Sequence, residues 1–154
     1  MHLRAFRSED LETLYKIDQA CFAPGISYPR EELSEFVSQR RSRTWIAEES
    51  GEIVGFLIVE RQGQKVAHIV TIDVVERWRR RGVGSLMMDA AEHWAREEKL
   101  LFVYLETAEN NDAAQRFYEA RGYRKVDRVE NYYSDATSAW VMLKWLKVKE
   151  AAEV

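Results

Sequence analysis

Glu106 and Tyr118, a glutamate and a tyrosine twelve residues apart, are the residues of this sequence best suited to acid–base chemistry. Glu106 follows the apolar run 100–105, which is typical of a buried parallel strand, and ligands bind beyond the carboxyl ends of such strands. A carboxylate can accept a proton and a phenol can donate one, so the pair suits a reaction in which one proton is removed from a reactant and another is delivered to the leaving group. Two structural interpretations stay open at this point: a surface carboxylate at a strand end, and a core aromatic on an apolar helix face.

A loop at residues 74–84 joins a predicted strand to a long predicted helix and is rich in arginine. Gly82 and Gly84 stand where the helix begins, and a helix N-terminus presents unpaired N–H groups and a partial positive charge. Glycine lets a ligand approach the backbone, and the arginines add charge-assisted contacts, so the loop suits a pyrophosphate. A plain turn with solvated arginines and a nucleic-acid patch are the alternatives. The spacing fits neither a dinucleotide-binding GxGxxG loop nor a P-loop.

Composition predicts one soluble domain over residues 1–154, because a chain of this length has no room for a second core. The net charge of -3 argues against a polycation that coats nucleic acid, and no apolar run is long enough to span a membrane. The first ten residues lack the apolar region of a signal peptide. Cys21 is the only cysteine, so we expect a small core residue, no internal disulfide and a cytoplasmic protein. No metal-ligating pattern surrounds His68 or His93, which are interpreted as strand-face and helix-face histidines.

Hydrophobic periodicity predicts seven strands and four helices in an α/β or α+β arrangement, with helices on both faces of the sheet. The predicted strands cover residues 3–6, 44–49, 53–60, 66–75, 100–105, 123–129 and 138–146. The first helix is expected to follow Ser8, which would be its N-cap. The other three are expected to begin near Pro29, Val83 and Asn111. Gly122 is expected to stop the last helix. The second, third and fourth strands are expected to form an antiparallel meander.

The sequence resembles the GNAT N-acetyltransferase superfamily from about Leu3 to Trp145. The run from Arg79 to Gly84 matches the Arg/Gln-x-x-Gly-x-Gly/Ala acyl-CoA loop of that superfamily. Within it, the chain is most similar to the ribosomal-protein N-terminal alanine acetyltransferases and related protein N-α-acetyltransferases. The closer likeness is carried by Ile72-Asp73-Val74, by the spacing of Glu106, Asn111 and Tyr118, by residues 118–123, and by Asn131-Tyr132-Tyr133. The resemblance implies a GNAT fold, with a mixed, mostly antiparallel sheet of about seven strands.

The resemblance also implies direct acetyl transfer from acetyl-CoA to a primary amine in a ternary complex, without a metal or a covalent enzyme intermediate. Glu106 matches the general base of the family and Tyr118 its general acid. The residues expected to contact acetyl-CoA are Ile72, Asp73, Val74, Arg79, Arg80, Arg81, Gly82, Val83, Gly84, Ser85 and Asn111. Those expected to contact the acceptor are Tyr28, Asp73, Tyr132 and Tyr133, within the segments 23–30 and 131–135.

The resemblance implies a protein N-terminal α-amine as the acceptor, and the chemistry of amines is compatible with it. At pH 7.4 about a quarter of an α-amine is neutral, against about 0.1% of a lysine side chain, so an α-amine needs only modest help from a base. One alternative is a small acceptor such as a polyamine, an amino acid or an antibiotic, which Asp73 and the acidic net charge suggest. The Asp73 carboxylate would either attract a cationic acceptor or point away from it. The other alternative is a non-catalytic acyl-CoA-binding module. The expected partners are acetyl-CoA and the acceptor, without nucleic acid or membrane, and the expected state is a monomer or homodimer.

Overall fold

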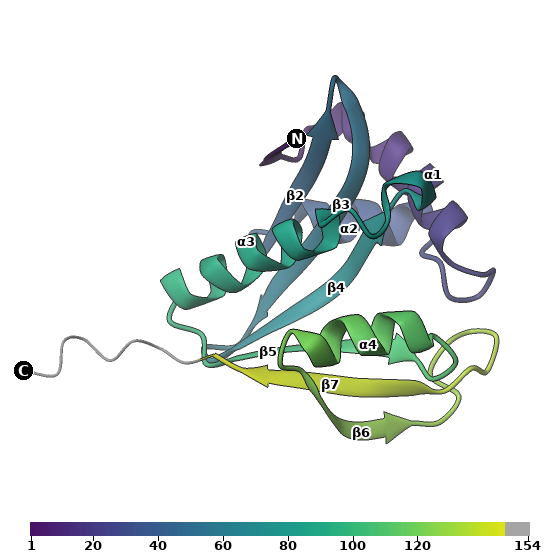
Figure 1. Cartoon of the computed structure of the whole chain (residues 1–154), viewed down its shortest axis with the longest axis vertical. Helices are drawn as coiled ribbons and strands as arrows, with labels where there is room; N and C mark the ends of the chain where they lie inside the picture. The colour runs from purple at the N-terminus through teal and green to yellow at the C-terminus, as the bar shows by residue number, and fades with distance from the viewer. Residues whose placement is uncertain (147–154) are drawn as a thin grey trace, which may run out of the picture.

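The computed structural model describes residues 1–146, which form one seven-stranded sheet flanked by four α-helices (Figure 1). The strands are β1 (His2–Ala5), β2 (Ser42–Glu49), β3 (Glu52–Gln62), β4 (Val66–Val74), β5 (Phe102–Ala108), β6 (Arg124–Val129) and β7 (Ala139–Trp145). The helices are α1 (Leu11–Cys21), α2 (Arg30–Ser38), α3 (Val83–Glu97) and α4 (Asp112–Ala120), with 3-10 turns at η1 (Ser8–Asp10) and η2 (Glu76–Trp78).

The strands are ordered β1-β2-β3-β4-β5-β7-β6 across the sheet. Only β4 and β5 pair in parallel, and the other five pairings are antiparallel. The predicted mostly antiparallel sheet of seven strands is therefore confirmed, together with the meander of β2, β3 and β4. No helix among residues 1–146 is both long and apolar enough to cross a membrane.

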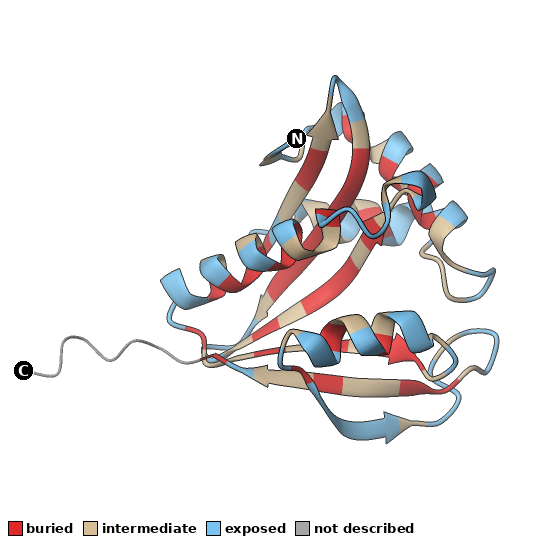
Figure 2. Cartoon of the chain, viewed as in Figure 1, coloured by how far each residue is buried: buried red, intermediate tan, exposed pale blue. Residues whose placement is uncertain are grey.

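Two apolar cores lie on opposite faces of the sheet because successive strand residues point to opposite sides. Phe56 and Ile58 of β3 pack in the core that α1 and α2 cover. Leu57 and Val59, their immediate neighbours, pack in the core beneath α3. Figure 2 shows the result as nearly continuous burial along β3 and β4, whereas β6 at the edge of the sheet is exposed.

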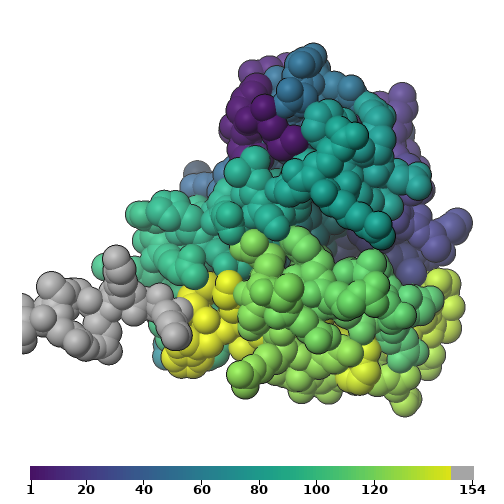
Figure 3. Space-filling view, in the orientation of Figure 1, coloured from purple at the N-terminus to yellow at the C-terminus, as the bar shows by residue number. Residues whose placement is uncertain are grey.

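The parallel strands β4 and β5 stay together for only part of their length. They pair from Val66 to His68 on β4 and from Phe102 to Tyr104 on β5, and both strands then continue without pairing to each other. Figure 1 shows them diverging from the point where they meet. The space-filling view of this face shows α3 in teal on one side and α4 in green on the other (Figure 3). The divergence leaves an unpaired edge on β4 that faces β5.

Two local predictions were wrong. Ser8 does not cap α1: it opens the turn η1, and Asp10 occupies the N-cap position instead. The Asp10 carboxylate accepts from the backbone N–H of Arg7 at 2.8 Å and from the Arg4 guanidinium, so contacts with β1 and the turn hold Asp10 at the start of α1. The strand predicted over 100–105 also extends to Ala108, because β7 pairs with it along its whole length. Glu106 therefore lies within β5 rather than after it.

Candidate functional site

The unpaired edge of β4 is the first part of the site. The carbonyls of Val70 and Val74 accept hydrogen bonds from side chains, from Tyr28 Oη at 3.2 Å and from Arg79 Nε at 3.0 Å. Ile72 lies between them, where β4 has no partner on the side of β5. An extended ligand can therefore pair with this backbone as an additional strand.

The loop before α3 presents its backbone as an anion site. Gly82 is the N-cap of α3 in the left-handed conformation, with φ of 84°, and no side chain caps the helix. The first intrahelical bond is donated by Leu86, so the N–H groups of Val83, Gly84 and Ser85 have no partner within the helix. The first turn carries no acidic residue. These groups and the helix dipole favour a bound phosphate.

The arginines of the loop hold its shape as well as supplying charge. Arg79 braces the loop against Val74, and the Arg81 guanidinium lies 4.8 Å from the centre of the Trp78 ring. Arg80 itself has a positive φ of 62°, as the tight turn requires. Arg77 forms an ion pair with Glu52. Several of these cations are thus already engaged within the protein, which fits a built loop better than a run of fully solvated arginines.

Asn111 and Gly84 have packing roles at the start of α4 and α3. The side chain of Asn111 caps α4, because its Oδ1 accepts from the backbone N–H of Ala114 at 3.1 Å. Asn111 is therefore the N-cap of α4, and its contact with acetyl-CoA stays a prediction. A Cβ on Gly84 would lie 3.3 Å from Phe117 Cζ, so glycine there lets α3 approach α4 closely. At the other end of α4, Gly122 adopts a φ of 94° and ends the helix as predicted.

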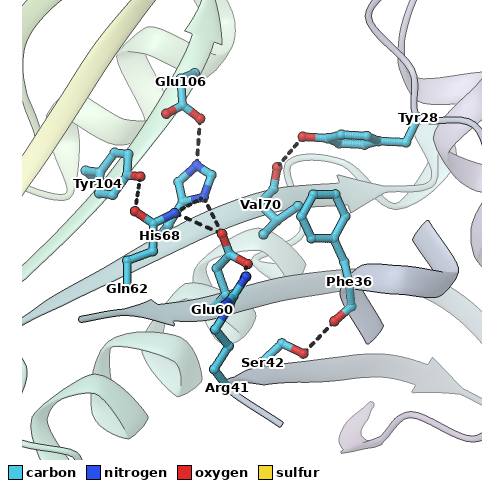
Figure 4. Close-up of polar contacts among 10 residues, drawn as sticks. All are labelled: Tyr28, Phe36, Arg41, Ser42, Glu60, Gln62, His68, Val70, Tyr104 and Glu106. Carbon is cyan, nitrogen blue, oxygen red and sulfur yellow. Dashed lines mark hydrogen bonds and ion pairs between the residues drawn. The ribbon is translucent and has the colours of Figure 1, made fainter. Parts of the chain in front are cut away.

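Glu106 points from β5 toward the neighbouring strand and meets a histidine. Its Oε1 lies 2.6 Å from Nε2 of His68 on β4 (Figure 4). The Glu106 side chain keeps 14% of its surface exposed, so it is partly open to a ligand. The other ring nitrogen of His68, Nδ1, lies 3.3 Å from Oε1 of Glu60 on β3. The site therefore contains a carboxylate, an imidazole and a second carboxylate in sequence.

Three of the tyrosines predicted at the site are electrostatic neighbours of Glu106. Burial raises the pKa of Tyr28, Tyr132 and Tyr133, and the nearby Glu106 carboxylate raises each of them further. Tyr132 and Tyr133 form an edge-to-face pair with ring centres 4.9 Å apart. The phenols predicted to contact the acceptor are thus close enough to the predicted base for its charge to affect their pKa values.

The two loops that carry these tyrosines also touch. The carbonyl of Gly25, in the segment between α1 and α2, accepts from the backbone N–H of Ser134 at 3.0 Å. Gly25 has a φ of 91°, and a Cβ on it would lie 2.9 Å from Cβ of Asp135. The close approach of the loops therefore depends on the absence of a side chain at this position.

Tyr118 lies on α4 with only 8% of its surface exposed, in contact with the rings of Phe117 and Tyr123. Burial raises its pKa, and the charges of Asp73 and Tyr133 raise it further, so the phenol holds its proton throughout the neutral range. Tyr133 is thereby an electrostatic neighbour of both Tyr118 and Glu106. Tyr118 packs in the same core as Leu105, whereas Glu106, the next residue of β5, points toward His68 on the other face of the sheet.

Asp73 is buried rather than open to an acceptor. Only 1% of its surface is exposed, its Oδ1 accepts from Thr71 Oγ1 at 2.5 Å, and it neighbours Asp18 of α1. Burial and the Asp18 charge raise the pKa of Asp73 well above its ordinary range, which favours one proton shared between the two acids. This placement favours the alternative in which the Asp73 side chain points away from the acceptor.

The remaining candidate ligands behave as structural groups. Burial raises the pKa of Cys21 to about 11, so its thiol is protonated and unreactive at neutral pH, as expected for a packing residue. His93 is an exposed residue of α3 beside Glu97. No group of three or more His, Cys, Asp or Glu side chains within residues 1–146 is arranged to hold a metal ion.

Sequence reasoning missed His68 and Asp18 as partners of the site. His68 was interpreted as an ordinary strand-face histidine, and its contact with Glu106 depends on the register that sets His68 opposite Tyr104. A two-residue step from Tyr104 places Glu106 on the same face of β5. Because β4 and β5 are separated by the whole of α3, no local pattern reports that register. Only a pairing of the two strands could have revealed it.

Comparison with known proteins gives a consistent result. Residues 11–123 match the model of the family described as "Acetyltransferase (GNAT) family". An N-alpha-acetyltransferase of Sulfurisphaera tokodaii is 27% identical over 156 residues, covering 91% of this chain and 90% of the relative. The structure of Ard1 from Thermoplasma volcanium aligns with a TM-score of 0.85 and 31% identity, over 94% of this chain and 97% of the other. The ribosomal-protein-S18-alanine N-acetyltransferase from Escherichia coli shares the fold, with a TM-score of 0.84, 21% identity, and coverage of 99% and 96%.

Proposed function

The chain belongs to the acetyltransferase (GNAT) family, and on that premise we propose that it transfers the acetyl group of acetyl-CoA to the α-amine of a protein N-terminus. The observation that carries the proposal is the placement of Glu106 on β5, in contact with His68 of β4 where the two strands diverge, with Tyr28, Tyr132 and Tyr133 as electrostatic neighbours. The N-alpha-acetyltransferase among its relatives supports the same acceptor class.

The residues around the gap fit acetyl-CoA as the acyl donor. The free N–H groups of Val83, Gly84 and Ser85 would hold the pyrophosphate, with the loop arginines beside it. Residues 72–74 pair with β3 on one side, and their other edge, which faces β5, would pair with the amide-containing pantetheine arm. Acetyl-CoA supplies the acetyl group as an activated thioester, and these contacts would place that thioester between the two strands.

Replacing Gly82 with valine is expected to raise the Kd for acetyl-CoA about tenfold. A β-branched residue is disfavoured at a φ of 84°, so we expect the free loop to relax to another conformation, and restoring the binding conformation at a cost of about 1–2 kcal/mol corresponds to roughly that factor. No protein atom lies within 4 Å of the position of a Cβ on Gly82, so the added side chain would also enter the open space in front of the loop. Isothermal titration calorimetry with acetyl-CoA measures the change.

Gly63→Val provides the matched control for that experiment. Gly63 lies in the turn between β3 and β4, also has a positive φ, and also has open space around its Cβ position. The control should lower the melting temperature by a similar amount and leave the Kd for acetyl-CoA unchanged. Equal losses of affinity in both variants would contradict the assignment of the loop as the pyrophosphate site.

The proton inventory of acetyl transfer matches the two predicted catalytic groups. The acceptor amine must lose a proton to attack the thioester, and the partly exposed Glu106 carboxylate can accept it directly or through a water. The departing thiolate needs a proton or a hydrogen bond. Tyr118 can donate it because its raised pKa keeps the phenol protonated. Base and acid work is thereby divided between β5 and α4.

The contact between Gly25 and the loop at Ser134 would form one wall of the acceptor groove. Gly25→Ala is expected to raise the KM for a peptide acceptor about tenfold, because a Cβ there meets Asp135 at 2.9 Å in an already strained conformation. The KM for acetyl-CoA should stay the same. Gly51→Ala is the matched control, since Gly51 has a φ of 79° and no neighbour within 4 Å. A peptide KM unchanged in Gly25→Ala would remove this contact from the acceptor groove.

The proposed function is tested by incubating the enzyme with acetyl-CoA and short peptides that have free N-termini, including one that begins with alanine as ribosomal substrates do. Mass spectrometry should show one acetyl group on the α-amine, and a peptide with a blocked N-terminus and an internal lysine should stay unmodified. Polyamines and amino acids are assayed in parallel for release of free thiol. Acetylation of a small amine with every α-amine untouched would reject the proposal in favour of the small-acceptor alternative, which the burial of Asp73 disfavours.

A further inference from the structure

Behind Glu106 lies a polar cluster that the mechanism above does not use. It comprises His68 of β4 together with Glu60 and Gln62 of β3 and Tyr104 of β5 (Figure 4). The His68 ring stacks on the Tyr104 ring at 4.5 Å, and Tyr104 Oη donates to Gln62 Oε1 at 2.5 Å. Gln62 Nε2 in turn donates to Glu60 Oε1 at 2.9 Å. The cluster holds both the imidazole and the Glu60 carboxylate in fixed orientations.

Glu60 is a buried carboxylate with little compensation. Only 6% of its surface is exposed, and its Oε2 makes no hydrogen bond within the described part of the chain. The nearest permanent cation, Arg41, lies 3.8 Å away and is 60% exposed at its side chain. A buried charge is costly unless it is paired. His68, at 3.3 Å, is the buried group that can become a cation and supply that pairing.

The imidazole of His68 is placed between two carboxylates. Nε2 faces Glu106 at 2.6 Å and Nδ1 faces Glu60 at 3.3 Å. A neutral imidazole has one N–H and can donate to only one of them, whereas an imidazolium donates to both. A neutral ring can also accept at Nδ1 from Gln62 Nε2 at 3.4 Å, but only the protonated ring donates a hydrogen bond to both carboxylates. A ring held in this way is suited to receive a proton.

We propose that His68 receives, through Glu106, the proton that the acceptor amine loses, and that Glu60 stabilises the imidazolium that results. The inference rests on the proposed function. An N–H bond of the amine breaks as an O–H bond forms on Glu106. That O–H bond then breaks as an N–H bond forms on Nε2 of His68, which returns Glu106 to its carboxylate form. His68 acts through Glu106 and is a positioning residue, with its proton released to solvent after turnover.

The electrostatic surroundings of the His68 ring determine how the rate should depend on pH. Burial alone lowers the pKa of His68, but the hydrogen bonds and charges of Glu106 and Glu60 outweigh it and raise the pKa above 6.5. The groups facing the ring are Glu60 and Gln62 from β3 and Tyr104 and Glu106 from β5, with Arg41 beyond Glu60. Only the neutral ring can accept a proton, so kcat/KM should fall as the pH drops through this raised pKa.

His68→Gln and Glu60→Gln test the relay. A glutamine at position 68 can still donate a hydrogen bond to Glu106 but cannot gain a proton. We expect kcat/KM for an α-amine peptide to fall about 10- to 100-fold, with an unchanged KM for acetyl-CoA and loss of the ionisation above pH 6.5. Glu60→Gln should move that ionisation to lower pH. The amine of the peptide titrates identically in all the enzymes, so differences between their profiles belong to the protein.

His93→Gln is the matched control, because His93 is 75% exposed at its side chain, and its profile should equal that of the unmodified enzyme. A His68→Gln variant with unchanged rate and profile would overturn the relay while the proposed function stands. NMR titration of the imidazole resonances of the full chain gives a readout without substrate. A His68 pKa above 6.5 that falls in Glu60→Gln supports the inference, and a value at or below 6.5, or one indifferent to Glu60, overturns it. Failure to acetylate any peptide would instead refute the proposed function.

Discussion

Tyr118→Phe is expected to lower kcat about 100-fold or more while leaving the fold intact. The change removes one hydroxyl and keeps the ring that packs against Phe117 and Tyr123. That hydroxyl makes no hydrogen bond within residues 1–146, so its loss leaves no partner unpaired. Loss of the group that protonates the leaving thiolate removes a general acid, whose contribution is typically about 10²- to 10⁴-fold. Steady-state kinetics and a melting curve together measure both parts of the expectation.

The neighbouring Tyr123 offers a control for that experiment. Tyr123 belongs to the same aromatic row, but its hydroxyl donates to Glu92 at 2.9 Å in the interior of the protein. Tyr123→Phe should therefore lower the melting temperature and leave kcat nearly unchanged. If Tyr118→Phe retained full kcat, the acid would have to be another group.

Glu106→Gln is expected to lower kcat/KM for an α-amine acceptor about 100-fold at neutral pH, as typical for removal of a general base. Glutamine keeps the shape of the side chain and an oxygen for His68, but it cannot accept the proton of the amine. The loss should shrink as the pH rises toward 9, because the α-amine, with a pKa of about 7.8, becomes neutral without help. Rate profiles between pH 6 and 9 measure this convergence.

Glu109→Gln serves as the comparison. Glu109 follows β5 directly and pairs with Arg128 at the surface, so its loss should leave the rates unchanged. A deficit in Glu106→Gln that stays constant across the whole pH range would show that Glu106 orients the acceptor and does not take its proton. An undiminished rate at neutral pH would remove it from the mechanism altogether.

The sequence alone predicted the elements of this fold because their signals are local. The apolar stripe of α3, the glycine at 122 and the apolar run of β5 each depend on residues close together in the chain. The loop before α3 and the candidate pair Glu106 and Tyr118 were predicted for the same reason, with resemblance to a family adding their roles. Those roles stay predictions until the variants above are measured.

Features that depend on contacts between distant elements were not predicted. The contact of His68 with Glu106 requires the register of β4 on β5, and the pairing of Asp73 with Asp18 requires α1 to lie across β4. The N-cap of α1 is Asp10 rather than the predicted Ser8 for a similar reason. The guanidinium of Arg4 on β1 donates to the Asp10 carboxylate at 2.8 Å and holds it at the start of the helix. In each case tertiary contacts decided between options that were locally equal.

Because β4 diverges from β5, binding of the acyl donor between them would raise the stability of the folded protein. The edge of residues 72–74 that faces β5 has no strand partner, and a pantetheine arm lying along it would supply the missing hydrogen bonds. A ligand that binds only the folded state adds about 2.7 kcal/mol to its stability at a concentration of 100 times Kd. A high concentration of acetyl-CoA in the cell would then raise the reaction rate and also protect the folded enzyme from proteolysis. A low concentration would slow the reaction and leave more of the enzyme open to degradation.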